Sequence, residues 1–387
     1  METLEILDRL IAFETVSRRP NRALVDFVET LLEGTGAEVR RIEDPSGTRA
    51  NLYATIGPID RPGVMLSGHT DVVPADGPGW SVPPFALTVT GGRAHGRGTA
   101  DMKGFVACAL GAARAASGRT LRTPLHLALS YDEEIGCVGV RSLVDALAAA
   151  PVAPAMCIVG EPTGLAVATG HKGKVACLAT CTGRAAHSAL APDGLNAIHL
   201  ACELVASLRA LQARLGTDGA ADAAYGVPHS TVHVGRIEGG TALNVVPERC
   251  TVEFELRTVA GDDPEALLET VRADARRSVE RVSGRFPEAD VRIEVVNAYP
   301  GLDTPEGAEV VRFVRSLIDD GGTGGTRKVS FGTEGGLFSS RAGIPTAICG
   351  PGSMDQGHRP DEYVELDQLG RCDAMLARLL ERLETGL

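Results

Sequence analysis

The sequence has no excess of basic residues and no long apolar segment. Its 387 residues include 38 Lys and Arg against 50 Asp and Glu, a formal net charge of −12. No basic patch dominates that could neutralise phosphates, which argues against nucleic acid and anionic membrane surfaces as partners. An apolar run at 146–160 contains two prolines and is shorter than the roughly 20 apolar residues that a membrane helix needs. We therefore expect no membrane-spanning segment.

Signals for secretion and for disulfides are equally scarce. Residues 1–16, METLEILDRLIAFETV, carry acids among the apolar residues and lack the basic start and apolar core of a signal peptide. The nine cysteines are odd in number, form no C-x-x-C pair and lie mostly in apolar runs. Cys177 and Cys181 fit small residues on one face of an alternating strand better than thiolate ligands. These features predict a cytoplasmic protein with reduced, buried thiols.

Phosphate-binding glycine motifs are also missing. The glycines of GRGTADMKG and GPGSMDQG superficially resemble phosphate loops. Neither segment has the spacing G-x-G-x-x-G between a strand and a helix, nor the spacing G-x-x-x-x-G-K-[ST]. The sequence therefore does not indicate a nucleotide-binding protein.

The composition is that of an ordinary globular protein. Hydrophobic residues make up 44% and charged residues 23% of a chain that is long enough for two domains. The first 170 residues alternate short apolar strands with amphipathic helices, and the same alternation returns after residue 300. This pattern predicts an α/β fold.

The middle of the chain follows a different order. The predicted elements there run β-α-β-β-α-β, which is the ferredoxin-like arrangement. We predict that residues 172–297 form an inserted α+β domain and that 1–171 and 298–387 form one discontinuous domain. The segments 216–229 and 321–326 contain turn-forming residues and are predicted to be flexible connections.

Polar clusters follow several of the predicted strands. In an open α/β sheet, loops at the carboxyl ends of the strands form the binding site, so residues from distant parts of the chain meet there. Two histidines and several carboxylates at such an edge indicate Zn²⁺ or a related divalent ion. The candidates are His69, Asp71, Asp101, Glu133, Glu134, Glu161 and His358.

Most of these candidates also have an ordinary explanation when taken alone. His69 could be a hydrogen-bonded loop histidine and Asp71 a turn residue, although together they fit a ligand held by a neighbouring carboxylate. Asp101, Glu133 and Glu134 stand where helices are predicted to begin, and such positions favour acids as caps or through the helix dipole.

The remaining two candidates differ in their surroundings. Glu161 lies in the apolar segment CIVGEP, where an unpaired charge is costly and a metal ion would relieve the cost. His358 lies in GHRPDEYV and could equally be a solvated loop residue.

In this order, five segments resemble the metal-site motifs of the M20 family of zinc-dependent aminoacylases and peptidases. They are SGHTDVVP, GRGTADMKG, DEEIG, GEPTG and GHRPDEYV, and the resemblance covers nearly the whole chain. It implies a zinc-peptidase-like three-layer α/β/α catalytic domain with the inserted ferredoxin-like α+β domain as a lid and dimerisation domain. A homodimer formed through the inserted domain is therefore expected.

The resemblance also implies a site with two divalent metal ions, Zn²⁺ or Co²⁺. Glu133 falls at the position of the general base, which takes a proton from the attacking water and passes it to the leaving amine, and Asp71 falls behind His69. The implied ligands are His69 and Glu161 for one ion, Glu134 and His358 for the other, and Asp101 as a bridge between them.

Further positions resemble family residues that handle the substrate. His187, in GRAAHSALAPDG, resembles a histidine that reaches the active site from the partner subunit, although it also fits a polar residue at a strand end. Arg257 and Asn244 resemble positions that handle the substrate carboxylate and the reaction-centre oxygen, but could be a solvated strand end and a turn residue. Glu334, in GTEGG, would pair with an amino group of the substrate, or be an exposed acid in a glycine loop.

Within the family, residues 160–203 and 330–365 look most like the members that deacetylate N2-acetyl-L-ornithine in arginine synthesis. The resemblance therefore implies a small N-acylamino-acid substrate. Other family members that cleave N-succinyl-diaminopimelate, dipeptides or other N-acylamino acids stay as alternatives. A non-catalytic metal-binding or regulatory protein is the alternative of another class, but a purely structural metal site has no use for an unligated base such as Glu133.

Overall fold

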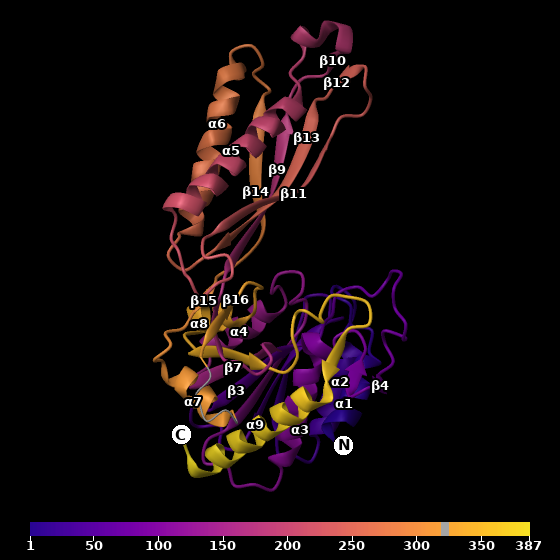
Figure 1. The fold of residues 1–387 in the computed structure, drawn as a ribbon, viewed down its shortest axis with the longest axis vertical. Coiled ribbons are helices and arrows are strands. Elements are labelled where there is room, and N and C mark those ends of the chain that lie inside the picture. The colour runs from indigo at the N-terminus through magenta and orange to yellow at the C-terminus, as the bar shows by residue number, and fades with distance from the viewer. Residues whose placement is uncertain (319–324) are drawn as a thin grey trace. The chain divides into compact units, whose positions relative to one another are not determined.

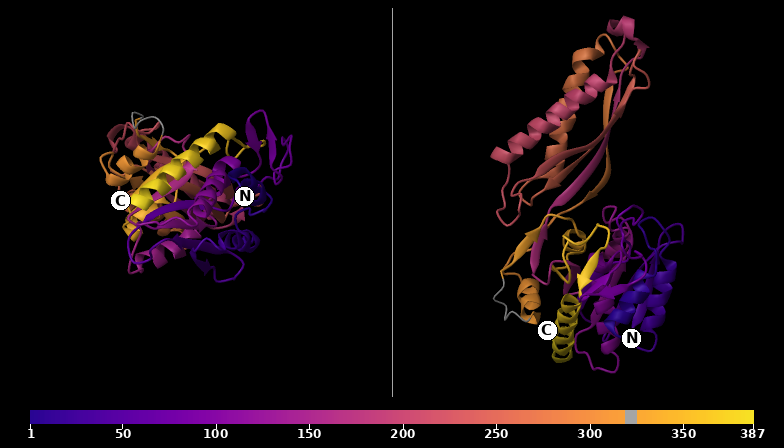
Figure 2. Two further views of the ribbon diagram at one scale, coloured as in Figure 1. Left: turned by 90° about the horizontal axis from the view of Figure 1, so that it is seen from below. Right: turned by 45° about the vertical axis from the view of Figure 1, so that its right-hand side comes forward.

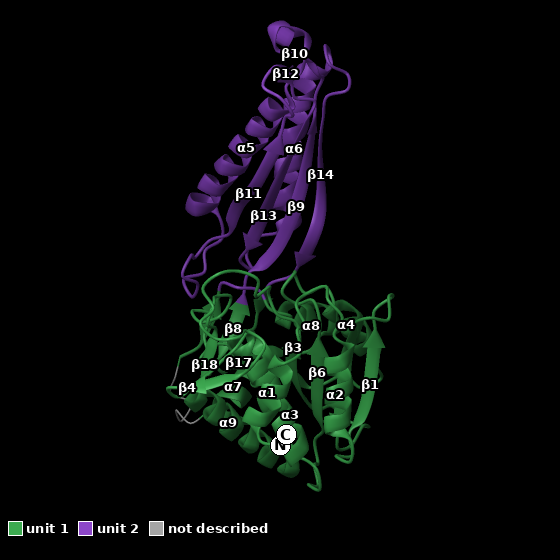
Figure 3. Ribbon diagram, turned by 90° about the vertical axis from the view of Figure 1, so that its right-hand side faces the viewer, with its two compact units in different colours: residues 1–170, 302–329, 333–387 green, residues 171–301, 330–332 purple. Residues whose placement is uncertain are grey.

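The computed structural model describes residues 1–318 and 325–387, which form two compact units (Figures 1 and 3). Most of the connection predicted at 321–326 lies outside the described residues. The units are unit 1, with residues 1–170, 302–329 and 333–387, and unit 2, with residues 171–301 and 330–332. We predicted boundaries after residues 171 and 297. In the structure the chain enters unit 2 after residue 170 and leaves it after residue 301, and residues 330–332 also belong to unit 2.

Unit 1 contains a mixed sheet whose four central strands, β6, β3, β7 and β17, run parallel. These strands are buried throughout, as expected for parallel strands covered on both faces. In sheet order the strands are β1 (Glu38–Glu43), β2 (Ala50–Ile56), β6 (Leu125–Ser130), β3 (Val64–His69), β7 (Met156–Pro162), β17 (Thr346–Gly350), β8 (Ala168–His171) and β15 (Leu302–Asp303), with β16 (Arg327–Val329) beside β8.

Helices cover both faces of this sheet. The chain passes from β3 to β6 through one helix, α3, and then back across the sheet to β7 through α4. Right-handed crossovers in opposite directions place these two helices on opposite faces. One connected layer holds α1 (Thr3–Ile11), α2 (Arg22–Leu32), α3 (Gly104–Ala115), α7 (Glu309–Leu317) and α9 (Leu366–Thr385), and the other pairs α4 (Val140–Ala148) with α8 (Gly335–Ala342).

Helix α3 lies in the middle of its layer. It packs on the central strands and also against α1, α2 and α9, and Figure 2 shows the yellow α9 beside it. Its sequence GFVACALGAARA is apolar almost all round, because nearly every side is buried. Phe105 and Leu110 belong to a hydrophobic core shared with Leu127 of β6 and Met375 of α9. The predicted three-layer α/β/α arrangement is confirmed for this unit.

A small three-stranded sheet flanks the irregular helical turn at Thr99–Lys103, which leads into α3. It joins parts of the chain that are far apart in sequence. Its strands, in order, are β18 (Tyr363–Glu365), β5 (Arg93–His95) and β4 (Thr88–Thr90).

Unit 2 has the predicted β-α-β-β-α-β order and an antiparallel sheet of order β11-β13-β9-β14, packed on α5 and α6. Cys177 and Cys181 point from one face of β9 into its core, as predicted, and neither forms a disulfide. Its main elements are β9 (Gly173–Thr182), α5 (Ala197–Asp218), β11 (Thr231–Gly239), β13 (Arg249–Thr258), α6 (Pro264–Ser283) and β14 (Asp290–Tyr299), with a ribbon of β10 (Ala186–His187) and β12 (Val245–Val246).

The segment 216–229 differs from its prediction as a flexible connection. Helix α5 continues into it as far as Asp218, and a bridge between Ala221 and His229 closes the loop that follows. The side chain of Tyr225 is buried in that loop. The turn-forming residues therefore build an ordered loop, because one aromatic side chain ties it to the rest of unit 2.

Among the described helices, none has both the length and the apolar composition needed to cross a bilayer.

Candidate metal centre

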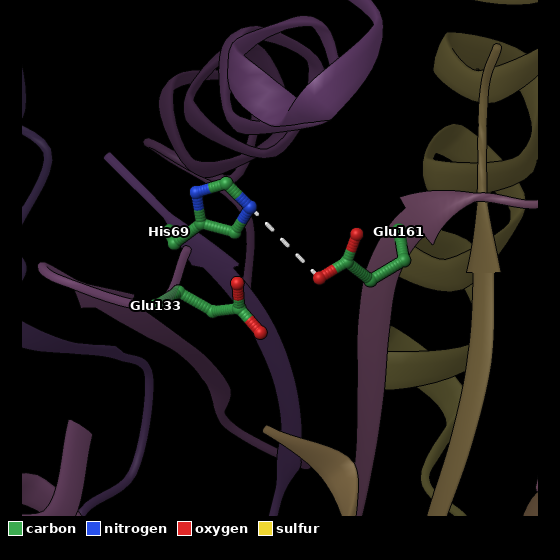
Figure 4. Close-up of side chains that lie close together, drawn as sticks. All are labelled: His69, Glu133 and Glu161. Atoms are coloured by element: carbon green, nitrogen blue, oxygen red, sulfur yellow. Dashed lines mark ion pairs between the residues drawn. The ribbon is translucent and has the colours of Figure 1, made fainter. Parts of the chain in front are cut away.

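The candidate metal ligands of unit 1 come from the carboxyl ends of its parallel strands. His69 ends β3, opposite Ser130 at the end of the adjacent β6, and Glu161 lies near the end of β7. Glu133 follows β6 after a short turn, and Figure 4 shows its side chain beside those of His69 and Glu161. The parallel register therefore brings together residues that are far apart in the chain.

His69 is fully buried and has one fixed orientation. Its Nδ1 donates a hydrogen bond to the backbone carbonyl of Asp71 (2.9 Å), because a carbonyl oxygen can only accept. Nε2 therefore faces the carboxylates. Burial alone would lower the pKa of the ring, but the hydrogen bond to Asp101 and the surrounding negative charges raise it well above its usual value. Once the Nε2 proton is displaced, that nitrogen can bind a metal ion. Nε2 lies 3.0 Å from Asp101 Oδ1 and 3.9 Å from Glu161 Oε1.

The carboxylate of Asp71 has a different role from the one expected behind His69. Its Oδ1 lies 3.6 Å from His69 Nδ1, so the backbone carbonyl is the closer acceptor. Oδ1 accepts the backbone N–H of Glu133 (3.0 Å), and Oδ2 accepts that of Glu134 (3.3 Å) and the hydroxyl of Ser17 (2.7 Å). Asp71 therefore orients His69 through its backbone and the two glutamates through its side chain.

Asp101 lies between the two histidines. Its Oδ1 faces His69 Nε2 at 3.0 Å, and its Oδ2 faces His358 Nε2 at 3.1 Å. His358 Nε2 also lies 3.0 Å from Glu134 Oε2. One carboxylate with an oxygen toward each histidine is the geometry of a bridging ligand between two metal positions.

The charges at the centre favour cations. Burial raises the pKa of Glu161 well above its usual value, and the charge of Asp101 raises it further. Burial likewise raises the pKa of Glu134 to about 7. Hydrogen bonds to Asp101 and Glu134 raise the pKa of His358 to about 10. A cluster of buried acids that retains protons in this way has excess negative charge, which divalent cations would compensate.

Two groups of side chains have ligand atoms close enough to share an ion. In each group the ligand atoms lie within 4.8 Å of one another, and the groups are His69 with Glu133 and Glu161, and His69 with Asp101 and Glu134. Imidazole and carboxylate are donors that suit zinc and related divalent metals. Both groups use His69, so they describe alternatives for one position, and His358 beside Glu134 and Asp101 offers donors for a second.

Glu133 is buried beside His69 and Glu161. Burial raises the pKa of its carboxyl group well above the usual value, with the positive charge of His69 acting in the opposite direction. The thiol of Cys137 donates a hydrogen bond to Glu133 Oε1 (3.2 Å). Asp132 and Cys137, on either side of the glutamate, both adopt a left-handed backbone conformation, with φ of 53°. Such backbone strain at non-glycine residues is concentrated at functional sites.

Glu334 is also in unit 1, but it is not the exposed loop acid that its glycine-rich segment allowed. Its side chain is 1% exposed and accepts hydrogen bonds from the hydroxyls of Ser67 (3.1 Å) and Ser130. Burial raises its pKa to about 7. It therefore lies against the ends of β3 and β6, the strands that lead to His69 and Glu133.

Three of the expected site residues belong to unit 2. His187 and Asn244 are exposed and adjacent, because β10 pairs with β12 and the Asn244 carbonyl accepts the Ser188 N–H (2.9 Å). His187 Nδ1 accepts the N–H of Ala189, so in the neutral ring Nε2 carries the proton and can donate it. Arg257 is elsewhere, roughly 25 Å farther along β13, where it donates to Glu255 and to the hydroxyl of Tyr299.

Several residues at the site were not predicted from the sequence. Three of them are small residues that nothing in the sequence marks as functional. Cys137 donates a hydrogen bond to Glu133, and Ser67 and Ser130 donate hydrogen bonds to Glu334. Glu362 and Arg97 lie inside the motifs GHRPDEYV and GRGTADMKG. Their position next to predicted metal ligands is the only feature of the sequence that could have drawn attention to them. Their contacts become visible only in the folded chain.

An α/β/α unit that brings two histidines and several buried carboxylates together beyond the carboxyl ends of its parallel strands is typical of a metal-dependent hydrolase. Residues 65–382 match the family described as peptidase family M20/M25/M40, and the chain belongs to that family. The resemblance seen in the five motifs is thus confirmed.

Curated relatives match over nearly the full chain. The acetylornithine deacetylase of Myxococcus xanthus is 36% identical over 381 residues, which cover 96% of this chain and 95% of that protein. The acetylornithine deacetylase of Proteus mirabilis (strain HI4320) is 31% identical over 390 residues, covering 98% and 96%.

Solved structures share the fold at low identity. An M20 family metallo-carboxypeptidase, Sso-CP2 from Sulfolobus solfataricus, matches with a TM-score of 0.80 and 18% identity over 100% of both chains. The YXEP protein of Bacillus subtilis, described as a dinuclear metal binding peptidase of the M20 family, matches with a TM-score of 0.66 and 15% identity over 98% of this chain and 96% of that one.

Proposed function

We propose that this protein hydrolyses N2-acetyl-L-ornithine to L-ornithine and acetate, a step of arginine synthesis in the cytoplasm. The observation that carries the hydrolytic part is the position of Asp101 between His69 and His358, with Glu133 beside them. The choice of substrate is supported by the full-length similarity to proteins named acetylornithine deacetylase.

The proposed centre holds two divalent ions. We propose Zn²⁺, and Co²⁺ would suit the same donors. When bound, the ions would polarise the amide carbonyl and lower the pKa of the attacking water. The proposed ligands are His69 and Glu161 at one position, Glu134 and His358 at the other, and Asp101 at both.

Glu133 is the proposed general base. Its carboxylate accepts a proton from the attacking water and then donates it to the nitrogen of the leaving amine. Its raised pKa supports this role, because a carboxylate that binds a proton more readily is the stronger base. Asp71 holds the backbone of Glu133, so the base has a defined position.

We propose that the exposed pair His187 and Asn244 stabilises the negative oxygen that develops on the carbonyl. The proton on His187 Nε2 makes that ring a suitable donor. We further propose a homodimer through unit 2, in which these residues serve the partner's centre and unit 2 acts as a lid. Arg257 is the proposed partner of the substrate carboxylate.

Glu334 is the proposed partner of the δ-ammonium group of ornithine. Each carboxylate oxygen can accept two hydrogen bonds, and the two serines use one on each oxygen. Ser67 and Ser130 would then orient the carboxylate rather than satisfy it. Burial would strengthen the pairing, since a charge pair attracts more strongly away from water.

The test is a comparison of substrates with purified protein reloaded with Zn²⁺ or Co²⁺. N2-Acetyl-L-ornithine should have the highest kcat/KM in a panel with N-succinyl-LL-diaminopimelate, a dipeptide and N-acetyl-L-norleucine. Norleucine has a methyl group in place of the terminal amine, so it isolates the contribution of Glu334. Preference for another amide would refute the substrate, and a metal-loaded protein inactive on the whole panel would favour the non-catalytic alternative.

A further inference from the structure

The backbone around Asp101 is held by one buried carboxylate, that of Glu362. Its Oε1 accepts the N–H groups of Ala100 (3.0 Å) and Asp101 (3.1 Å), and its Oε2 accepts that of Gly98 (3.0 Å). The Glu362 side chain is 1% exposed. Hydrogen bonds from neutral donors to an ionised acceptor are stronger than those between neutral groups, and burial increases the cost of losing them.

Arg97 supplies the opposite charge. Its Nη1 lies 2.7 Å from Glu362 Oε2, and its side chain is 3% exposed. It also donates to the carbonyl of Pro74 (3.3 Å) and lies over the ring of Trp80. Burial raises the pKa of the Glu362 carboxyl group, and the N–H of Gly98 and the guanidinium of Arg97 oppose that effect. The guanidinium also holds the carboxylate in place, whereas a buried charge without such a partner would be costly.

The segment that Glu362 holds satisfies only part of its own backbone, through the Lys103 N–H, which donates to the Gly98 carbonyl (2.8 Å). Within the turn at Thr99–Lys103, Asp101 (φ −123°, ψ 96°) and Met102 (φ −132°, ψ 31°) are not helical, so a regular hydrogen-bond ladder is interrupted there. An external acceptor takes its place. The opposite side of the turn is tied down by Lys103, whose Nζ donates to the carbonyls of Leu10 and Phe13 at the end of α1.

The same short segment of chain supplies His358 and Glu362. Glu362 immediately precedes β18, and its backbone carbonyl accepts the N–H of Gly96 (2.9 Å) just after β5. The segment therefore provides one histidine facing Asp101 Oδ2 and also the clamp on the Asp101 backbone. Both oxygens of Asp101 depend on where that backbone lies.

We propose that Glu362 is a positioning residue for the metal centre, acting through the backbone of Asp101. It sets the distances from Asp101 to His69 and to His358, and thereby the affinity of both metal positions. This inference rests on the proposed two-metal centre. It does not require the proposed substrate.

The test is Glu362→Gln, measured first by metal binding rather than by activity. The substitution keeps the size of the side chain but replaces one acceptor oxygen with an NH₂ group that faces N–H donors. Metal-free wild type and variant are titrated with Zn²⁺ against a chromophoric chelator, and with Co²⁺ by visible absorption, which reports coordination geometry. We expect the variant to bind Zn²⁺ about 10- to 100-fold more weakly, as is typical for groups that orient ligands. The cobalt spectrum should change as well.

The matched control is Glu365→Gln. Glu365 joins the same two strands, through Arg93 Nε at 3.0 Å, but it is 38% exposed and makes no described contact with residues 98–101. Zinc affinity should be unchanged in this variant. If Glu362→Gln binds Zn²⁺ as tightly as wild type and only lowers Tm, the residue is merely structural and the proposal is wrong.

A double variant, Arg97→Gln with Glu362→Gln, covers the case in which the single variant does not fold. It leaves no buried charge without a partner, so it should fold more readily. Metal affinity should stay low, because the backbone N–H groups still lack a charged acceptor. If the double variant binds Zn²⁺ as tightly as the wild type, the proposal is wrong.

The stoichiometry of the wild-type protein tests the centre itself. If the wild type binds fewer than two ions, the proposed centre is refuted, and this inference with it.

Discussion

Replacing Glu133 by glutamine separates proton transfer from metal binding. The amide has the same size as the carboxylate, and its carbonyl oxygen can still accept the hydrogen bond from Cys137. The backbone N–H of residue 133 can still donate to Asp71 (3.0 Å). The variant should therefore keep its fold and its metal content while it loses the group that accepts a proton.

The expected loss is in kcat. General acid–base catalysis contributes about 10²- to 10⁴-fold, equivalent to about 3–5 kcal/mol of transition-state stabilisation. KM should change little, because the amide occupies the same space. The assay measures kcat and KM for N2-acetyl-L-ornithine at saturating Zn²⁺, together with the zinc content per chain.

The adjacent glutamate provides the contrasting control. Glu134 faces His358 Nε2 at 3.0 Å and is a proposed ligand, so Glu134→Gln should lower zinc content as well as kcat. Two neighbouring, isosteric substitutions are thus expected to differ in metal content. Unchanged turnover in Glu133→Gln would refute its role as a base, and loss of zinc would make it a ligand, as its closeness to His69 and Glu161 allows.

Further predictions concern specificity, metal and pH. Glu334→Gln should reduce the preference for N2-acetyl-L-ornithine over N-acetyl-L-norleucine about tenfold or more in kcat/KM, and an unchanged ratio would remove Glu334 from the specificity site. Asp101→Asn should weaken both metal positions, seen as a lower zinc stoichiometry after dialysis, whereas loss of a single ion would argue against a bridge. Removal of zinc by a chelator should lower Tm, because an ion at a hundred times its Kd stabilises the native state by about 2.7 kcal/mol per site. Burial lowers the pKa of His126 to about 4, so the unfolded chain binds a proton near pH 6.5 that the native state does not. The contribution of His126 to the free energy of unfolding should thus be fully present above pH 6.5, and roughly 3 kcal/mol of it at most should be lost between pH 6.5 and 4. His126→Gln should lessen that fall in urea unfolding curves, and an identical pH dependence would contradict the assignment.

The fold was predictable because its signals are local. Alternating burial in β9 and the order β-α-β-β-α-β mark unit 2, and continuous apolar strands such as 64–66 mark a sheet covered on both faces. The ordered loop that holds Tyr225 was not predicted, since turn-forming residues indicate where the chain bends and not whether the bend is packed.

The candidate site was predictable in its residues but not in its contacts. The motifs around His69, Asp101, Glu133 and His358 are short, and the first three stand at predicted strand or helix boundaries. Their meeting at one edge follows from the rule that parallel strands end together. No such rule predicts that the backbone carbonyl of Asp71, and not its carboxylate, accepts the hydrogen bond from His69 Nδ1.

The sequence by itself determined which residues are candidates for the chemistry, because ligand types, strand ends and helix starts are properties of short segments. Only the tertiary structure decided how those residues are held. Asp71 supports the glutamates through its side chain, Glu334 is buried under two serines, and Glu362 clamps the backbone of Asp101 across an interval of 261 residues. Such contacts depend on the packing of segments that are distant in the chain, and hydrogen-bond distances of about 3 Å have no counterpart in a local pattern.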